Sequence, residues 1–325
     1  TGVQTCALPI SDLKAILHSK RANIYYLEKC RVMQKSGRVL YLVAEQQDGQ
    51  AEKQYWNIPI ANTTVILLGT GTSITQAAVR MLASAGVLIG FSGSGATPLL
   101  VATEIEWLTP QSEYRPTEYI QGWMSFWFDA DKRLTVAKEF QQKRIQFLQK
   151  VWSSDRDLKQ EGFDIQESDI ESALNNFSNQ IELCESVTKL LLVEAHLTKR
   201  LYRIAASRTK QQDFTRNYES VDDANSFLNH GNYLAYGLAA TTLWVLGIPH
   251  GFAVMHGKTR RGALVFDVAD LIKDTLILPW AFICAKERAT EQEFRQQCLQ
   301  NFTKHKALDF MFNTVKEISL RGTEQ

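Results

Sequence analysis

The most informative segment of this chain runs from residue 249 to residue 274 and reads PHGFAVMHGKTRRGALVFDVADLIKD. His256 precedes a basic loop that two glycines bound, and three acids follow. On a helix, their i, i+3, i+7 spacing places the carboxylates of Asp267, Asp270 and Asp274 on one face. The rest of that helix is almost wholly apolar, with Lys273 as its only base. Because carboxylates in apolar surroundings need compensation, the pattern predicts a divalent metal ion beside them.

A further acid stands on an apolar helix face earlier in the chain. The periodicity over Val187–Ser207 predicts a helix, and Glu194 falls inside its apolar stripe. A carboxylate on a buried face is costly unless it is paired. A buried salt bridge would explain it, but the unbalanced acids downstream favour a metal-binding or active-site role. His196 falls on the polar side, which indicates a surface or DNA-proximal residue and not a ligand.

One histidine, one glutamate and an aspartate pair, without cysteine, make a harder donor set than zinc prefers. Such ligands suit Mg²⁺ or Mn²⁺, and no HExxH pattern is present. Between Ser186 and Arg261 there are ten Lys or Arg against five Asp or Glu, although the whole chain has a formal net charge of only +1. A metal beside a basic surface predicts phosphoryl transfer on nucleic acid, with a solvated basic loop as the alternative for residues 258–261. The residues predicted to contact DNA are Lys258, Arg260, Arg261, Lys199 and Arg203.

Composition is that of an ordinary globular protein, with 325 residues, 45% hydrophobic and 22% charged. Five scattered cysteines without a CxxC pair argue against a disulfide framework or structural zinc. They indicate a cytoplasmic, prokaryotic setting once the family resemblance below is considered. No apolar run reaches transmembrane length, so no membrane association is expected. Residues 1–10 fit no pattern and are expected to be non-native or truncated sequence.

Hydrophobic periodicity predicts an α+β fold, a mostly-β domain over residues 11–105 followed by an all-α helical catalytic domain over residues 117–325. Residues 106–116, polar and with two prolines, are expected to be the linker. One helix is expected within the β domain, at Ile74–Ala85. The helix at Lys132–Trp152 is expected to expose many Lys, Arg and Gln side chains. The expected strands are Ala22–Leu27, Cys30–Met33, Val39–Val43, Gln54–Ile58, Val65–Leu68, Val87–Phe91 and Pro98–Thr103.

Several segments together carry a family resemblance. They are HSKRAN at 18–23, YWNIPIANT at 55–63, LGTGTSITQA at 68–77, WLTPQSEYRPTEY at 107–119, HGNYLAYG at 230–237 and the segment at 249–274. With these motifs the chain, from Ser11 to its end, closely resembles the CRISPR-associated integrases, the "Cas one" proteins, in their I-F (Ypest) subtype.

The resemblance implies a site and an activity. It implies that Glu194, His256 and Asp270 hold the metal and that Asp267, the fourth catalytic position, supports them. It implies a metal-dependent DNA endonuclease and integrase that inserts short foreign DNA (spacers) into the CRISPR array by transesterification. The implied partners are double-stranded or branched DNA with the CRISPR repeat, a second copy of the chain that pairs through the β domain, and a "Cas two" protein. In this subtype "Cas two" is expected to be fused to the "Cas three" helicase-nuclease.

Two other functions remain open from the residues. A non-catalytic DNA-binding scaffold subunit of a nucleoprotein complex would use the same basic surface. A nucleotide site at Gly69–Ser73 is disfavoured because the third glycine of GxGxxG is replaced by Ile74. The turn is expected to cap the next helix with Thr72 or Ser73. Asp274 is expected to support the site or to lie on the surface.

Overall fold

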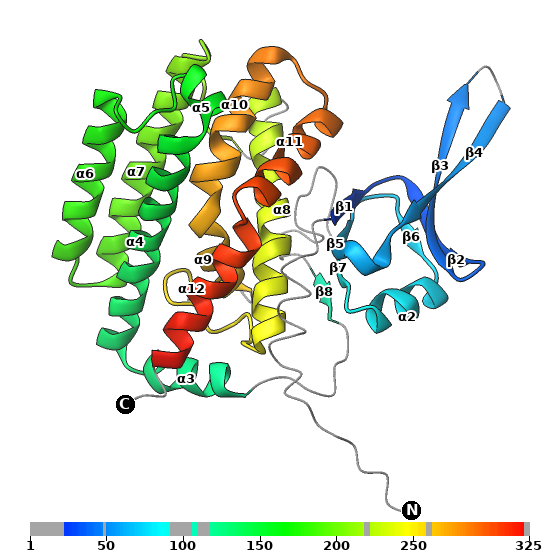
Figure 1. Ribbon diagram of the computed structural model, residues 1–325, viewed down its shortest axis with the longest axis horizontal. Helices are drawn as coiled ribbons and strands as arrows, with labels where there is room; N and C mark the ends of the chain where they lie inside the picture. Colours follow the sequence, from blue (N-terminus) through cyan, green and yellow to red (C-terminus); the bar gives the residue numbers. More distant parts are fainter. Residues whose placement is uncertain are drawn as a thin grey trace, which may run out of the picture.

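The structure, a computed structural model, describes residues 23–47, 50–91, 106–109, 117–217, 222–257 and 262–321. Strands come first and helices follow, which confirms the predicted α+β class (Figure 1). Residues 1–10, the expected strand Pro98–Thr103 and the basic residues Lys258, Arg260 and Arg261 lie outside the described residues.

The strands form two four-stranded sheets. In the first, β1, β5 and β7 run parallel and β8 joins β7 antiparallel. All six residues of β5 are buried, because this strand lies inside its sheet and is covered on both faces. The second sheet includes the hairpin of β3 and β4, which extends away from the body (Figure 1). The strands are β1 (Asn23–Leu27), β2 (Cys30–Lys35), β3 (Arg38–Gln47), β4 (Gln50–Ile58), β5 (Thr63–Leu68), β6 (Ser73–Ile74), β7 (Leu88–Phe91) and β8 (Glu106–Leu108).

The glycine-containing turn after β5 supports the strands around it. The hydroxyl of Thr72 donates to the carbonyl of Leu27, 2.9 Å away. A side chain at Gly69 would place its Cβ 2.5 Å from Cγ of Glu28, so this close approach requires glycine. The helix α2 (Gln76–Ser84) is capped by Thr75, whose side chain accepts from the N–H of Ala78. The prediction that Thr72 or Ser73 caps this helix is therefore wrong.

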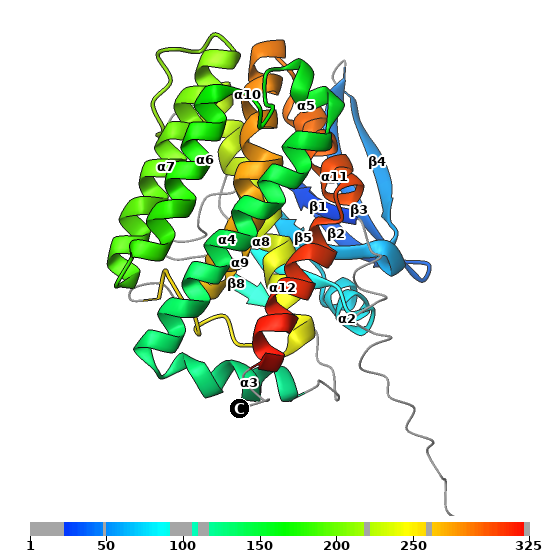
Figure 2. The ribbon, with the colours of Figure 1, turned by 60° about the vertical axis from the view of Figure 1, so that its left-hand side comes forward.

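The helical part is organised around α8. This helix packs against α9, α10 and α12 on one side and against β5 on the other (Figures 1 and 2). Gly237 allows the contact with the sheet, since a Cβ there would lie 2.9 Å from Cγ1 of Val65. The helices are α3 (Glu118–Trp127), α4 (Ala130–Ser154), α5 (Arg156–Gln160), α6 (Ser168–Leu183), α7 (Val187–Arg208), α8 (Asp223–Leu246), α9 (Ala263–Ile272), α10 (Leu278–Glu287), α11 (Glu291–Lys304) and α12 (Ala307–Arg321).

One prediction about these segments needs correction. The expected linker at 106–116 begins with β8, because Trp107 pairs with Gly90 and packs against the helical core. Helix α4 exposes Lys132, Gln146 and Lys150. Its Gln141 and Arg144 are each 2% exposed, because this face of α4 lies against α7 and η3 (Lys273–Ile277). No helix among the described residues is both long and apolar enough to cross a membrane.

Candidate active site

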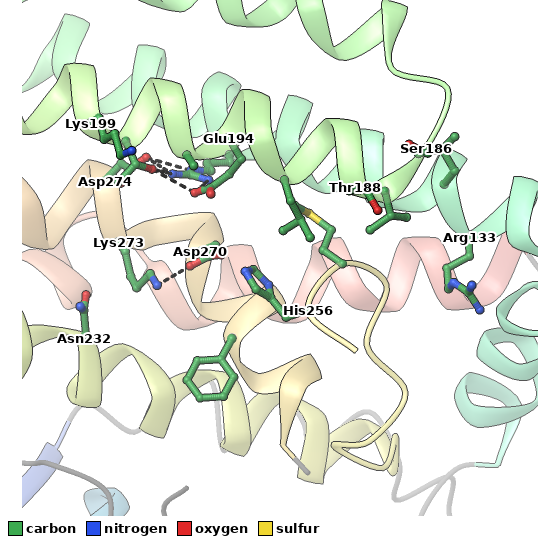
Figure 3. A pocket seen from close by; sticks show the side chains of 18 of the residues that line it. Arg133, Ser186, Thr188, Glu194, Lys199, Asn232, His256, Asp270, Lys273 and Asp274 are labelled. Atoms are coloured by element: carbon green, nitrogen blue, oxygen red, sulfur yellow. Dashed lines mark hydrogen bonds and ion pairs between the residues drawn. The ribbon is translucent and has the colours of Figure 1, made fainter. Parts of the chain in front are cut away.

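A cavity of about 880 Å³ opens between α4, α7, α8 and the segment that runs from His256 through α9 to α10. Three of the predicted residues, Glu194, His256 and Asp270, line this cavity, together with Asp274. Figure 3 shows these four side chains together with Lys273, while Arg133, Ser186 and Thr188 lie toward the other end. The fold therefore brings residues from α7, α9 and the loop before α9 to one place.

Asp267 fixes the histidine. It is 3% exposed, and its carboxylate accepts four hydrogen bonds, two at each oxygen. Backbone N–H groups of Val254 and Met255 bind Oδ2 at 2.7 and 3.1 Å. The N–H and Nδ1 of His256 lie 3.2 and 2.7 Å from Oδ1. All four lone-pair positions of Asp267 are occupied, so it orients His256 and leaves Nε2 as the ring nitrogen for a ligand.

This pairing also affects the charge of the imidazole. Burial lowers the pKa of His256, but the hydrogen bond to Asp267 and the charges of Asp270 and Asp267 outweigh burial and raise it. The basic nitrogen that results is a better metal ligand once it has lost its proton.

Two tryptophans hold the loop that carries His256. The indole nitrogen of Trp123 donates to the carbonyl of Phe252 at 3.0 Å, and that of Trp127 donates to the carbonyl of Ala253 at 2.8 Å. The aromatic stripe of α3 thus packs in the core, and it also anchors the backbone three residues before the histidine.

Asp270 has its own cation. It is 5% exposed and forms an ion pair with Lys273, three residues later at the start of η3. Burial raises the pKa of Asp270, but Lys273, His256 and Arg144 together lower it, so the carboxylate is charged. The ammonium group of Lys273 also lies 5.4 Å from the ring centre of Tyr236, which adds a cation–π contact.

Glu194 and Asp274 share a guanidinium that the sequence did not reveal. Arg144 of α4 donates to Oε1 of Glu194 at 2.9 Å and, through Nε, to Oδ2 of Asp274 at 2.9 Å. Its Nη2 forms a second bond to Asp274. The salt bridge considered for Glu194 is therefore present. Asp274 is 5% exposed, so it is a buried ion-pair partner, and the prediction of a surface acid is wrong.

A break in helix geometry places Lys273 and Asp274. Between α9 and α10 the chain forms the π-helical turn η3. Pro279 has no N–H for the carbonyl of Thr275 four residues earlier, and the indole of Trp152 donates to that carbonyl at 3.1 Å instead. Pro279 thus accompanies the interruption of this helix, and Trp152 satisfies the carbonyl that would otherwise lack a donor.

Acids outnumber cations at the centre. Four carboxylates (Asp267, Asp270, Asp274 and Glu194) face two cations, Arg144 and Lys273. Burial raises the pKa of Asp274 even though Arg144 lies beside it. The imidazole and carboxylate donors suit Mg²⁺ or Mn²⁺. Arg144 and Lys273 compensate part of the acidic charge for which the sequence pattern predicted a metal ion.

The predicted ligands are neighbours around the cavity, but they are not gathered into a coordination sphere. In the described part of the chain, no three His, Cys, Asp or Glu side chains approach closely enough to form a metal-binding group. Glu194 instead faces Arg144, and Asp270 faces Lys273. Metal binding would therefore need these carboxylates to turn from their cations or to bind through their other oxygens.

Two of the predicted DNA-contact residues, Lys199 and Arg203, lie among the described residues. Both are exposed on α7; Lys199 lines the cavity, and Arg203 lies outside the cavity lining. Among the described residues, neither forms an ion pair. By contrast, Arg200 and Arg208 of the same helix bond to Asp169 of α6. His196 is exposed and outside the cavity lining, as predicted.

Sequence reasoning missed Arg144, although a signal was present. Arg144 stands four residues from Phe140 and four from Leu148, so it falls on the buried stripe of α4. The same test that singled out Glu194 on α7 would have found it.

Comparison with known proteins agrees with the family that the sequence motifs predict. Residues 24–312 match the family model of the CRISPR associated protein Cas1. The CRISPR-associated endonuclease Cas1 of Pseudomonas aeruginosa is 55% identical over 319 residues, 96% of this chain and 97% of that protein. The Cas1 endonuclease of Pectobacterium atrosepticum is 54% identical over 315 residues, 95% of each chain. A casposase bound to its integration product has the same fold, with a TM-score of 0.71 at 14% identity over 93% of this chain and 91% of the casposase. The family predicted from the motifs is confirmed: this chain belongs to the CRISPR-associated Cas1 family, and its two close relatives support the I-F subtype.

Proposed function

We propose that this protein is a metal-dependent DNA endonuclease and integrase that inserts short foreign DNA into a CRISPR array. One observation carries the proposal. The carboxylate-oriented imidazole of His256 and the carboxylates of Glu194 and Asp270 line a single cavity. One imidazole and two carboxylates at one cavity form a donor set that suits a divalent ion such as Mg²⁺ or Mn²⁺.

In this proposal, Glu194, His256 and Asp270 hold Mg²⁺ or Mn²⁺. The bound ion would polarise the phosphodiester and favour ionisation of the attacking hydroxyl. Asp267 holds His256 through the four bonds described above, so it positions a ligand and touches neither metal nor substrate. Lys273 stays beside Asp270, where its charge would also attract a phosphate oxygen.

The reaction proposed is a displacement at phosphorus. In integration, the 3′-hydroxyl oxygen of the incoming strand forms a bond to a phosphorus of the repeat. The bond from that phosphorus to the displaced oxygen of the repeat strand breaks, and the proton of the attacking hydroxyl passes to the displaced oxygen or to solvent. Hydrolysis by the same site differs only in that water supplies the attacking oxygen.

The DNA backbone is proposed to run along the outer face of α7. Lys199 and Arg203 project there, and α7 has no acidic residue after Glu194. Lys258, Arg260 and Arg261, which lie outside the described residues, belong to the same proposed contact by sequence. Phosphate contacts of this type position DNA without reading its sequence.

The partners are proposed from the similarity of this chain to its relatives. The casposase neighbour holds an integration product, which supports DNA as the substrate. A homodimer through the strand-containing part is proposed, with a "Cas two" protein fused to the "Cas three" helicase-nuclease as the second partner. The alternative function, a non-catalytic DNA-binding scaffold, would need the basic face of α7 but not the acidic centre.

Strand transfer into a repeat-containing duplex separates the two functions. The assay combines purified protein, its fused partner, and Mn²⁺ or Mg²⁺. We expect Asp270→Ala and His256→Ala to abolish both strand transfer and cleavage of branched DNA while DNA binding persists. The matched control is Asp213→Ala, which removes an exposed acid outside the cavity lining. Unchanged strand transfer by the Asp270 and His256 variants would support the scaffold function instead.

A further inference from the structure

Arg144 is the most completely bonded side chain of the cavity. A guanidinium has five N–H donors, and all five are used. Nε and Nη2 bind Oδ2 of Asp274, Nη1 binds Gln141 and Glu194, and the remaining proton of Nη2 binds Oγ1 of Thr198 at 3.1 Å. The residue is 2% exposed, so its orientation is fixed by these bonds and by packing.

The bonds to Glu194 use only one of its oxygens. Nη1 of Arg144 and the hydroxyl of Thr198 both donate to Oε1, at 2.9 and 3.0 Å. Glu194 is half-buried on the cavity wall, and Oε2 takes neither bond. Arg144 and Thr198 therefore restrict the rotation of the carboxylate and leave one oxygen for another ligand.

Asp274 anchors this arrangement from the other side. Its Oδ2 accepts from Nε and Nη2 along one edge of the guanidinium, which directs Nη1 toward Glu194. Burial by itself lowers the pKa of Arg144, but the charges of Asp274, Glu194 and Asp270 more than offset burial and raise it. Arg144 thus stays a cation in a site from which water is largely excluded.

We propose that Arg144 is a positioning residue for the metal ligand Glu194, and that Asp274 in turn positions Arg144. The inference rests on the proposed metal centre and adds two residues to it. Without the anchor, the guanidinium would be free to take both oxygens of Glu194 and would compete with the metal. Without the fork geometry, Glu194 would have to be ordered by the metal itself, which weakens binding.

The test measures Mn²⁺ affinity by calorimetry on the full chain without DNA, so that it does not depend on activity. Arg144→Lys keeps the charge but cannot reproduce five planar donors, and we expect its Mn²⁺ dissociation constant to rise about tenfold. Asp274→Asn should raise it by a similar factor. If Asp274 acts through Arg144, the double variant should bind Mn²⁺ as weakly as Arg144→Lys alone, and a product of the two factors would overturn that part of the proposal.

A milder pair of variants guards against misfolding. Thr198→Val removes the hydroxyl that binds Oε1 of Glu194 but keeps the shape of the side chain, and it should weaken Mn²⁺ binding severalfold. Thr198→Ser, which keeps the hydroxyl, should restore the affinity. Asp213→Asn provides the control for loss of one negative charge away from the cavity. Wild-type affinity in both Arg144→Lys and Thr198→Val would refute the positioning role.

The proposed metal centre can fail separately from this inference. If the wild-type chain binds no Mn²⁺, the metal centre itself is wrong. If the wild type binds Mn²⁺ and Glu194→Gln weakens binding, but the variants of Arg144, Asp274 and Thr198 do not, only the positioning role is wrong.

Discussion

Replacing Asp267 by asparagine exchanges one carboxylate oxygen for an NH₂ group and tests how His256 is oriented. The carboxylate accepts four hydrogen bonds, from the backbone of Val254, Met255 and His256 and from Nδ1 of His256. An asparagine oxygen replaces one carboxylate oxygen, but the NH₂ group cannot accept from the two donors that face the other. Whichever way the amide turns, a pair of donors is left facing another donor.

The magnitude follows from those two lost bonds. A buried donor left without an acceptor costs about 1–3 kcal/mol, so two donors cost about 2–4 kcal/mol if the loop relaxes partly. For a chain of this size that corresponds to a fall in melting temperature of roughly 3–6 °C. Because His256 loses the partner that sets its tautomer, Mn²⁺ affinity should also fall about tenfold to a hundredfold.

Two measurements on the same preparation check this reasoning: the thermal unfolding midpoint without added metal, and Mn²⁺ titration by calorimetry. Asp213→Asn again serves as the control for charge alone. A melting temperature and a Mn²⁺ affinity both equal to those of the wild type would refute the view that Asp267 orients His256. A fall in stability with unchanged affinity would mean that the aspartate supports the loop but not the ligand.

Three further predictions concern the helix break, the seam between sheet and helices, and the DNA contact. Trp152→Phe removes the donor to the carbonyl of Thr275 and should lower the unfolding free energy, measured in urea, by about 1–3 kcal/mol. An unchanged unfolding free energy would mean that this hydrogen bond does not stabilise the π-helical turn. His230 is buried against Tyr26 with its Nε2 unpartnered among the described residues, and burial, aided by the charge of Arg295, lowers its pKa to about 4. Because the unfolded chain binds a proton near pH 6.5 and the folded chain does not, the stabilisation is present at neutral pH and is lost as pH falls toward 4. The loss is about 2–3 kcal/mol at pH 4.5, and His230→Phe should remove this part of the pH dependence of urea unfolding. Lys199→Ala and Arg203→Ala should each reduce the slope of log affinity for duplex DNA against log salt concentration by about 0.9, whereas Lys150→Ala, exposed on α4, should leave the slope unchanged.

Much of the fold could be predicted because the information is local. The switch from alternating to helical periodicity near residue 117 follows from how side chains repeat on strands and helices. The interruption before Pro279 follows from a missing N–H. Thr75, and not Thr72 or Ser73, caps α2 because the turn residues are used by the neighbouring strands instead.

The acids Asp267, Asp270 and Asp274 look equivalent by spacing but differ in the structure. Asp267 binds a loop that precedes it, Asp270 binds Lys273 on its own helix, and Asp274 binds Arg144 on α4. A helical repeat fixes the direction of a side chain but not its partner. The partner depends on which element packs opposite, and the three acids face three different elements.

The sequence by itself determined the α+β order, the acids on apolar helix faces and the family resemblance, and the resemblance implied Glu194, His256 and Asp270 as one site. Spacing along a helix and the cost of a charge on an apolar face are properties of short segments, so they can be recognised without a fold. Only the tertiary structure showed the contacts of Arg144 and Trp152. Arg144 meets Glu194 and Asp274 from 50 and 130 residues away, and Trp152 meets Thr275 from 123 residues away. Such pairings depend on how α4, α7 and η3 pack together, since hydrogen bonds act over about 3 Å and not along the chain.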